Sequence, residues 1–349
     1  MAYTTIPKST DYFNTKLYTG TDNSNAITGL NFQPDFTWIK KRSGAASHAL
    51  QDAVRGNDKT FRTNNTGAQY TNSFFSSFNS DGFTVATSET DANADGSTYA
   101  SWNWKANGAG SANTTGSINS TVSANTTSGF SIVSYTGNGT SGATVGHGLG
   151  VVPQVIIVKR LNATDQTIMY HHKLNATPQD YYIRISDTGV ASDFAGMWND
   201  TAPTSSLFSI GNSATTNASS EAMIAYCFAE KQGYSKFGSY TGNGNADAPF
   251  IYTGFKPAWI MIKKTSASGT NWFLFDSKRL GYNVANYYLS ANTTLADRTS
   301  PFLDILSNGF KLRTTETDVN ASGATYIFMA FAEAPFVANS GESIPTTAR

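Results

Sequence analysis

The alternation of apolar and polar positions along the chain predicts short β-strands separated by turns. Runs of roughly four to eight residues, rich in β-branched and aromatic side chains, are bounded by Gly, Asn, Ser or Pro. A clear example is Asp35–Lys41, which follows Pro34. Only residues 45–55 and 297–306 suggest a turn or two of helix, and neither has a sustained apolar stripe. Sheets without helices to cover them are expected to pack face to face.

The same pattern of positions occurs three times along the chain. Tyr-Thr-Gly-Asn-Gly stands at 135–139 and at 240–244, and its shortened form Tyr-Thr-Gly stands at 18–20. The copies therefore begin 117 and 105 residues apart (135−18 and 240−135). Because about 100 residues is the usual size of an independent domain, the repeat predicts similar domains in tandem. We expect an all-β protein of three tandem antiparallel β-sandwich modules, of jelly-roll or concanavalin-like lectin type.

Composition sets the expected boundaries between these modules. Residues 107–128 are almost wholly Gly, Ser, Ala, Thr and Asn, as is typical of a linker, and no such segment separates the second and third copies. We therefore expect the first module to be mobile and the other two to be joined. The expected divisions are an N-terminal anchoring arm at 1–12, β-sandwich repeats at 13–106, 129–232 and 233–337, the linker at 107–128, and a C-terminal tail at 338–349.

Two sets of apolar positions recur at fixed places in the copies. A proline precedes each apolar run, which ends in two basic residues; these prolines are Pro34, Pro153 and Pro257. In the second and third copies the run is apolar on both faces, which predicts a central strand covered from two sides. Near the end of each copy an aromatic residue stands 11 positions after an asparagine, and we expect these aromatic residues to be equivalent core residues: Trp104, Phe228 and Phe331.

The charge and the cysteine content exclude several classes of partner. Charged residues make up only 14% of the chain, and 24 basic residues balance 24 acidic ones. No net field therefore attracts nucleic acid or an anionic membrane, and no apolar run is long enough for membrane insertion. The first residues lack the pattern of a signal peptide, so export by the general secretory route is not expected. The single cysteine, Cys227, excludes a disulfide framework, and we expect it to be buried.

One segment resembles part of a calcium-binding loop. Asp91, Asn93 and Asp95 have the spacing of the first half of an EF-hand loop, but Trp102 stands where the bidentate glutamate is required. We therefore favour a loop between strands that is held by Asx turns, and keep a weak calcium site as the alternative.

Charged residues also recur after each proline. Asp52 with Arg55 and Asp276 with Arg279 are spaced for an ion pair that fastens a loop to the sheet edge, whereas the second copy has His171 nearby. Catalysis would need a second acid, or a nucleophile with its base, at a matching offset, and none recurs. The histidines also lack metal-ligand spacing.

The basic pairs that end the apolar runs have a structural interpretation. We expect them to form cross-strand ion pairs with Glu230 and Glu333, which recur at the end of the neighbouring aromatic strands. An anionic ligand on this basic surface is the alternative.

The repeated segments together resemble a repeat domain of uncharacterised function in large structural proteins of tailed, especially marine, bacteriophages. They are Tyr-Thr-Gly-Asn-Gly, the proline with its apolar run and basic pair, Asn-Gly-Phe at 308–310, and Asn-Ala-Ser-Gly-Ala-Thr-Tyr at 320–326. The third copy matches best, and the second departs most because it lacks the Asp and Arg pair. The resemblance implies a virion component of the tail or fibre class and transfers no catalytic residues.

We therefore expect a non-enzymatic virion structural protein without a cofactor, assembled in the host cytoplasm and exposed on the particle. Its expected partners are other tail, baseplate or capsid proteins, a host cell-surface glycan or receptor, and further copies of itself, including a trimer. The alternatives are a capsid decoration protein (head fibre) and a virion glycan hydrolase. The hydrolase would need two convergent carboxylates in one groove.

Overall fold

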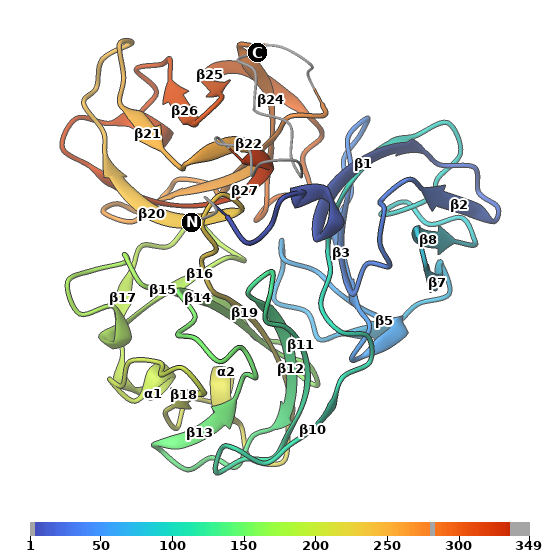
Figure 1. Ribbon diagram of the computed structural model, residues 1–349, viewed down its shortest axis with the longest axis vertical. Helices are drawn as coiled ribbons and strands as arrows, with labels where there is room; N and C mark the ends of the chain where they lie inside the picture. The colour runs from blue at the N-terminus through green and yellow to red at the C-terminus, as the bar shows by residue number, and fades with distance from the viewer. Residues whose placement is uncertain (1–3, 280–282, 336–349) are drawn as a thin grey trace.

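The structure, a computed structural model, describes residues 4–279 and 283–335. It is all-β with antiparallel sheets, and its strands form three groups around a central axis (Figure 1). Each group corresponds to one sequence repeat, and we name them module 1 (13–106), module 2 (107–232) and module 3 (233–335). Among the described residues, no helix has the length and the apolar character needed to cross a membrane.

Module 1 contains a six-stranded sheet and a three-stranded sheet. Its strands are β1 (Phe13–Thr19), β2 (Asn25–Thr28), β3 (Phe36–Lys41), β4 (His48–Asp52), β5 (Gly56–Phe61), β6 (Tyr70–Thr71), β7 (Phe75–Asn79), β8 (Gly82–Val85) and β9 (Thr98–Trp104). The larger sheet has the order β1-β9-β3-β4-β5-β6, and the smaller one has the order β2-β8-β7.

Module 2 contains an eight-stranded sheet and a two-stranded sheet. Its strands are β10 (Ser111–Asn113), β11 (Ser120–Asn125), β12 (Phe130–Thr136), β13 (Ala143–Gly146), β14 (Val155–Arg160), β15 (Thr167–His171), β16 (Tyr181–Arg184), β17 (Ser192–Asp193), β18 (Leu207–Ile210) and β19 (Ala222–Phe228). The larger sheet has the order β10-β11-β12-β19-β14-β15-β16-β17, and β13 pairs with β18. The short helices are η2 (Pro178–Asp180), α1 (Ala195–Trp198) and α2 (Ala214–Asn217).

Module 3 is a nearly closed eight-stranded barrel. Its strands are β20 (Ser235–Thr241), β21 (Phe250–Tyr252), β22 (Phe255–Lys264), β23 (Phe273–Asp276), β24 (Ala285–Ser290), β25 (Arg298–Leu306), β26 (Gly309–Leu312) and β27 (Thr325–Pro335), with the helical turn α3 (Thr317–Asn320). Their order is β20-β27-β22-β23-β24-β25-β26-β21. The all-β class is confirmed, but a tandem of three jelly-roll sandwiches is not, because module 3 forms one barrel.

All modules nevertheless share one pairing pattern. Counted from the start of each sequence repeat (13, 129 and 233), the first strand pairs with the last, and the last also pairs with the strand that the proline precedes, as in β1-β9-β3, β12-β19-β14 and β20-β27-β22. The second strand pairs with the second-to-last, as in β2-β8, β13-β18 and β21-β26. The sequence repeat is therefore a repeat of topology.

The central strand of each module has both faces buried. In β14, Ile156 and Val158 face the core of module 2, whereas Val155 and Ile157 face the axis and join side chains from the other two modules. Each central strand is therefore covered on one face by the core of its own module and on the other by side chains of the neighbouring modules. This arrangement explains why the runs are apolar on both faces.

The aromatic residues near the end of each copy meet on the axis. Trp104, Phe228 and Phe331 are almost fully buried, and their ring centroids lie 6.4 Å (Trp104 to Phe228), 5.5 Å (Trp104 to Phe331) and 5.8 Å (Phe228 to Phe331) apart. They belong to one hydrophobic core that contains residues of every module. This shared core corrects the expectation of a mobile first module, since separating module 1 would expose it to water.

Residues 107–128 correct the expectation of a linker. They contain β10 and β11, and β11 pairs with β12 along the edge of the sheet, with Thr121 opposite Ser134. Ile118 and Val122, the larger apolar residues of the segment, are buried in the core of module 2. Backbone hydrogen bonds and two buried side chains are sufficient to hold a small polar sequence as an edge strand.

The expected N-terminal arm packs, from residue 4 on, against its own chain. Ile6 is fully buried in the shared core, and the short helix η1 (Ser9–Asp11) contacts β1 and β27. Tyr12 meets Tyr234 edge to face, with ring centroids 6.2 Å apart. The described part of the arm therefore joins module 1 to module 3, and residues 1–3 lie outside the described residues, as does the expected tail at 338–349.

Candidate functional site

The repeated prolines are buried where the central strands begin. Pro34 and Pro153 each stand two residues before the first residue of a central strand. Pro257 lies inside β22, at a register shift in its pairing with β27. Because proline lacks a backbone N–H, a strand start or a bulge is where it costs least.

A buried asparagine fastens the Tyr-Thr-Gly turn in each copy. In module 2, the Asn217 side-chain oxygen accepts hydrogen bonds from the backbone N–H of Asn138 (2.8 Å) and Gly139 (3.2 Å). The hydroxyl of Tyr135 donates to the carbonyl oxygen of Thr216 at 2.7 Å. A Cβ on Gly137 would overlap the carbonyl oxygen of Ala218, so glycine is required there. The same asparagine contacts recur at Asn93 and Asn320, so these repeated residues form a structural clasp.

The residues considered for calcium have protein partners. Asp91 accepts from the backbone N–H of Ser47 (2.7 Å) and forms an ion pair with Arg62 (2.6 Å). Asn93 is buried in the clasp, whereas Asp95 is exposed. Within residues 4–279 and 283–335, no group of three or more His, Cys, Asp or Glu side chains is placed to hold a metal ion.

The Asp52 and Arg55 pair lies at the interface with module 2. The Arg55 Nε atom lies 2.5 Å from Asp52 Oδ2, and both side chains are buried. The Tyr226 hydroxyl of module 2 donates to the same carboxylate oxygen at 2.7 Å. Burial raises the pKa of Tyr226 well above its ordinary value, which keeps the hydroxyl protonated as a donor. The ion pair therefore fastens two modules together.

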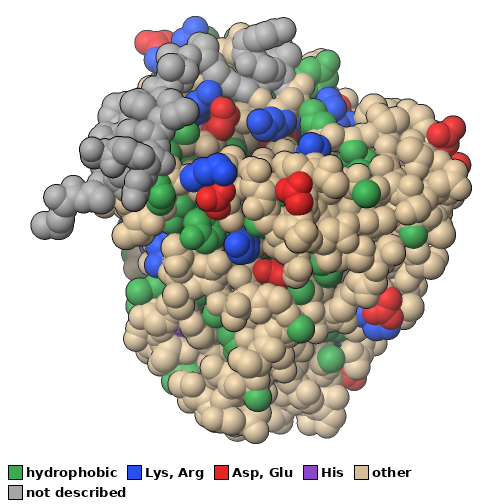
Figure 2. All heavy atoms as spheres, turned by 45° about the vertical axis from the view of Figure 1, so that its right-hand side comes forward, with side chains coloured by type: hydrophobic (Ala, Val, Ile, Leu, Met, Phe, Trp, Pro, Cys, Tyr) green, Lys and Arg blue, Asp and Glu red, His purple; other side chains and the backbone are tan. Residues whose placement is uncertain are grey.

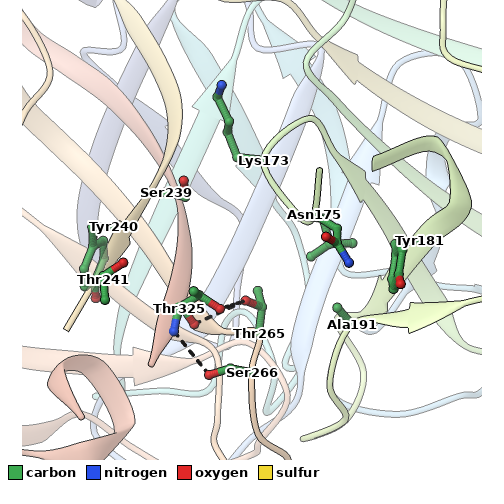
Figure 3. A pocket seen from close by; sticks show the side chains of 11 residues that line it. Lys173, Asn175, Tyr181, Ala191, Ser239, Tyr240, Thr241, Thr265, Ser266 and Thr325 are labelled. Carbon is green, nitrogen blue, oxygen red and sulfur yellow. Dashed lines mark hydrogen bonds between the residues drawn. The ribbon is translucent and has the colours of Figure 1, made fainter. Parts of the chain in front are cut away.

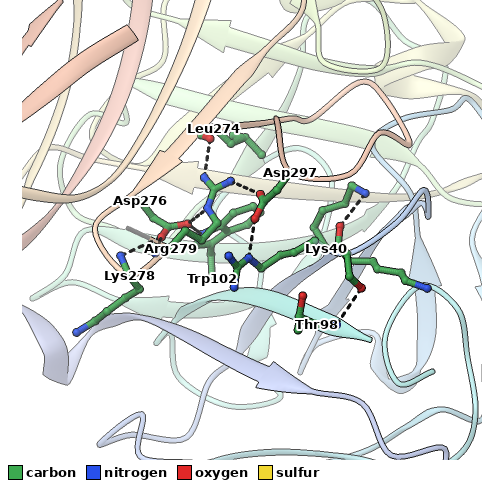
Figure 4. Close-up of polar contacts among 11 residues, drawn as sticks. Lys40, Thr98, Trp102, Leu274, Asp276, Lys278, Arg279 and Asp297 are labelled. Atoms are coloured by element: carbon green, nitrogen blue, oxygen red, sulfur yellow. Dashed lines mark hydrogen bonds and ion pairs between the residues drawn. The ribbon is translucent and has the colours of Figure 1, made fainter. Parts of the chain in front are cut away.

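The Asp276 and Arg279 pair makes the equivalent contact between modules 3 and 1 (Figure 4). Arg279 Nε lies 2.7 Å from Asp276 Oδ2, which also accepts from the indole N–H of Trp102 in module 1 at 3.1 Å. Arg279 also pairs with Asp297 at 2.8 Å, and Asp297 pairs with Arg42 of module 1 at 2.7 Å.

Module 2 lacks the acid, and the structure shows what replaces it. His171 occupies the position of Asp52 and Asp276, and its Nε2 lies 3.2 Å from the carbonyl oxygen of Phe328 in module 3. Burial lowers the pKa of His171 to about 3, so the ring is neutral at pH 7. Module 3 has Met329 where the other modules have Trp102 or Tyr226, and methionine cannot donate a hydrogen bond. The interface between modules 2 and 3 therefore lacks both the carboxylate and the side-chain donor that the other two interfaces have.

The first basic residue of each pair is also an interface residue. The lysines Lys40, Lys159 and Lys263 have no exposed surface, which corrects the expectation of ion pairs with Glu230 and Glu333. Those glutamates pair with other lysines instead. Each buried ammonium group donates to a loop carbonyl of another module: Lys40 to Thr294 (3.2 Å), Lys159 to Thr66 (3.1 Å) and Lys263 to Thr188 (3.3 Å).

These contacts describe a closed ring. Each module uses one surface to contact the next module and a different surface to contact the previous one. After three such contacts the ring closes on the first module. Sequence reasoning missed the ring because it assigned the repeated residues to contacts within a module. The sequence did carry one signal of the ring: the second copy lacks the aspartate, and the third copy lacks the Trp or Tyr that would donate to it.

One face of the molecule shows how its surface charges are distributed. On the face in Figure 2, basic and acidic side chains lie near one another, mainly in the upper part of the view, and neither sign forms a patch of its own. The repeated aspartates Asp52 and Asp276 are not on this surface, because each is buried against its arginine. Open clefts are therefore the better candidates for binding.

One cleft lies between modules 2 and 3 beside β20, and we name it the β20 cleft (Figure 3). It has a volume of about 460 Å³. Asn175, Tyr181 and Ala191 line one side, from module 2, and hydroxyl residues of module 3 line the other. The hydroxyls of Thr265 and Thr325 lie 2.9 Å apart in this wall.

Two further clefts adjoin β21, and we name them the β21 clefts. Their volumes are about 330 and 380 Å³, and both are lined by Lys236 and Tyr252. The side chains of Phe250 and Tyr252 are 44% and 55% exposed, whereas most large apolar side chains of the described chain are buried. Lys236 forms an ion pair with Glu230 (2.9 Å) at the edge of the clefts. Exposed ring faces beside carboxylate and hydroxyl groups can bind a ligand that is apolar on one side and hydroxyl-rich on the other.

Comparison with protein families gives a match that covers most of the chain. A family model described as a domain of unknown function (DUF7483) matches residues 8–335 as a single domain. No curated protein and no solved structure matches the chain significantly. The matched range spans all three modules, in agreement with their shared core.

Proposed function

We propose, from the premise that the chain belongs to the DUF7483 family, that it is a non-enzymatic structural protein of a tailed bacteriophage particle. It belongs to the tail or fibre class and attaches the particle to a host cell-surface glycan. The observation that carries the proposal is the use of the repeated polar residues: the buried acids and lysines hold modules together, which leaves the clefts for binding. A ring of three modules that share one core suits a particle component.

The β21 clefts are the proposed glycan site. Sugar rings have an apolar face that packs on aromatic side chains, and Tyr252 and Phe250 offer exposed rings for this contact. Glu230 lines one of these clefts, and its carboxylate can accept hydrogen bonds from sugar hydroxyls.

Binding of the purified protein to host surface polysaccharide tests the site. Tyr252→Ala is expected to weaken binding about tenfold, since stacking on one ring is worth roughly 1 kcal/mol or more. Phe194→Ala is the matched control, because Phe194 is an equally exposed aromatic residue in module 2, 48% exposed, and is expected to leave binding unchanged. Equal effects of both substitutions would contradict the proposed site.

The place of the protein in the particle tests the role. Cryo-electron microscopy of purified particles is expected to locate the chain at the tail, whereas a capsid position would identify a decoration protein. Absence from the particle would refute the proposal. Release of sugars from the host envelope by the purified chain would favour the hydrolase.

A further inference from the structure

The outer edge of β20, beside the β21 clefts, binds a carboxylate of the chain itself. One oxygen of the Glu230 carboxylate accepts a hydrogen bond from the backbone N–H of Phe237 at 2.7 Å. The other oxygen lies 2.9 Å from the ammonium group of Lys236. Hydrogen bonds to ionised groups are shorter and stronger than neutral ones. A backbone N–H of this edge and a lysine together therefore make a good carboxylate site.

Ser239 carries the next backbone N–H on the same edge. Alternate residues of an antiparallel strand direct their backbone groups to the same side, so the N–H of Ser239, like that of Phe237, points away from β27. Ser239 lines the smaller β21 cleft, which has a volume of about 330 Å³. Within residues 4–279 and 283–335, no acceptor for this N–H is found on that side.

Lys173 brings a positive charge to the smaller cleft from module 2. It follows β15, its side chain is exposed, and it lines this cleft together with Ser239. Figure 3 shows its ammonium group directed away from the hydroxyls of Thr265 and Thr325. Among the described residues no ion pair is found for Lys173, since the carboxylate of Glu230 is paired with Lys236. The smaller cleft therefore has a donor pair that resembles the pair around Glu230.

The charges around the β21 clefts are complementary to an anion. Among the described residues that line the smaller cleft, Lys173 and Lys236 are basic and none is acidic. The larger cleft adds Glu230, so the two clefts together carry one more positive than negative side chain. Phe250 and Tyr252 place their exposed rings beside these lysines. A ligand with one carboxylate and an apolar ring face matches both the charge and the rings.

We propose that the glycan bound at the β21 clefts is acidic and carries a carboxylated sugar such as a hexuronic acid. This inference rests on the proposed function and specifies its ligand. The sugar ring packs on Tyr252. Its carboxylate accepts hydrogen bonds from the backbone N–H of Ser239 and from Lys173, as the Glu230 carboxylate does from Phe237 and Lys236.

A matched pair of sugars tests the charge of the ligand. The probes are trigalacturonic acid and its methyl ester, in which every carboxyl group is uncharged, and the readout is isothermal titration with the full chain. The acid is expected to bind about tenfold more tightly than the ester, because hydrogen bonds to charged groups are the stronger ones. High salt is expected to reduce this preference, since it screens exposed charges.

A matched pair of lysine substitutions tests the place of the contact. Lys173→Met is expected to weaken binding of the acid about tenfold and to change binding of the ester by less than about twofold. Lys278 is the control, because it stands two residues after Asp276 as Lys173 stands two residues after His171, and it is also exposed. Lys278→Met is expected to leave the binding of both sugars unchanged.

Amide hydrogen exchange tests the backbone contact on the unchanged chain. The acid is expected to slow exchange at Ser239, and unchanged exchange would overturn the proposal. Equal affinities for the acid and the ester, binding of neither, or equal effects of the two lysine substitutions would also overturn it. Host polysaccharide that binds through Tyr252 without any acidic sugar would overturn this inference and leave the proposed function standing. Host polysaccharide that does not bind would contradict the glycan site itself.

Discussion

A lysine at the end of each central strand carries its ammonium group into an interface. Burial lowers the pKa of Lys40, Lys159 and Lys263 from 10.5 to about 8, because the charged form is poorly solvated there. Carbonyl oxygens of another module partly replace the lost water. The same residue that fastens the ring therefore makes its stability dependent on pH.

We predict that the free energy of unfolding rises between pH 8 and 9, before tyrosines of the unfolded chain begin to ionise. Between the folded pKa of about 8 and the ordinary value of 10.5, the unfolded chain binds more protons at Lys263 than the folded chain does. Each lysine thus adds up to about 1.4 kcal/mol of stability per pH unit, and this contribution is lost as the pH falls through 8. Urea unfolding across this range measures the slope.

Substitution identifies the residue responsible. Lys263→Met is expected to reduce the slope, whereas Lys264→Met, at the half-buried next residue, is expected to preserve it. Buried tyrosines such as Tyr226 have a raised pKa, so above about pH 9 the unfolded chain releases tyrosine protons that the folded chain keeps, and this opposes the effect of the lysines. An identical slope in both variants would show that other groups titrate.

At the scale of elements, each module is held by the clasp between its first turn and its last loop. Tyr135 and Gly137 stand about 80 residues before Asn217 in the sequence. The Tyr135 hydroxyl nevertheless bonds the residue before Asn217, and the Asn217 side chain bonds the residue after Gly137. A side chain at Gly137 would meet the backbone, which cannot move aside without breaking these bonds.

We predict that Gly137→Ala lowers the free energy of unfolding by about 2–4 kcal/mol, since the added methyl group must displace a packed backbone. Chemical denaturation measures the loss. Thr136→Ala, at the exposed neighbouring position, is the control and is expected to change stability by less than about 0.5 kcal/mol. A small effect of Gly137→Ala would mean that the loop relaxes freely.

The local sequence pattern correctly predicted strands whose conformation depends on burial alone, as in the apolar run of β14. It failed for segments whose conformation depends on pairing with strands that are distant in sequence. Residues 45–55 and 297–306 looked weakly helical, but His48–Asp52 and Arg298–Leu306 are strands because neighbouring strands pair with them. The residues of β10 and β11 looked like a linker because a sequence pattern does not show which sheet edge is free.

At the scale of the whole molecule, the shared core makes the modules one folding unit. The sequence predicted Trp104, Phe228 and Phe331 as core residues, and it also predicted pairing of Asp52 with Arg55. It could not predict the donors to the aspartates, since these stand in another copy and a period of about 100 residues suggested independent domains.

We predict that the protein unfolds in one transition and that Phe331→Ala lowers the stability of all three modules together, by about 3–5 kcal/mol. Calorimetry, with tryptophan fluorescence as a second probe, measures this, since Trp38, Trp102 and Trp104 report on module 1. Resolved transitions, or first proteolytic cuts within 107–128, would indicate separable modules.

The head-to-tail ring has a consequence for assembly. Every module carries both halves of the interface, so three separate copies of one ancestral module could close the same ring, but only at concentrations above their dissociation constants. Joining them in one chain replaces that requirement with a fixed effective concentration set by the short connections. Dilution therefore does not open the ring, and each module is free to diverge, as the paired loss at His171 and Met329 illustrates.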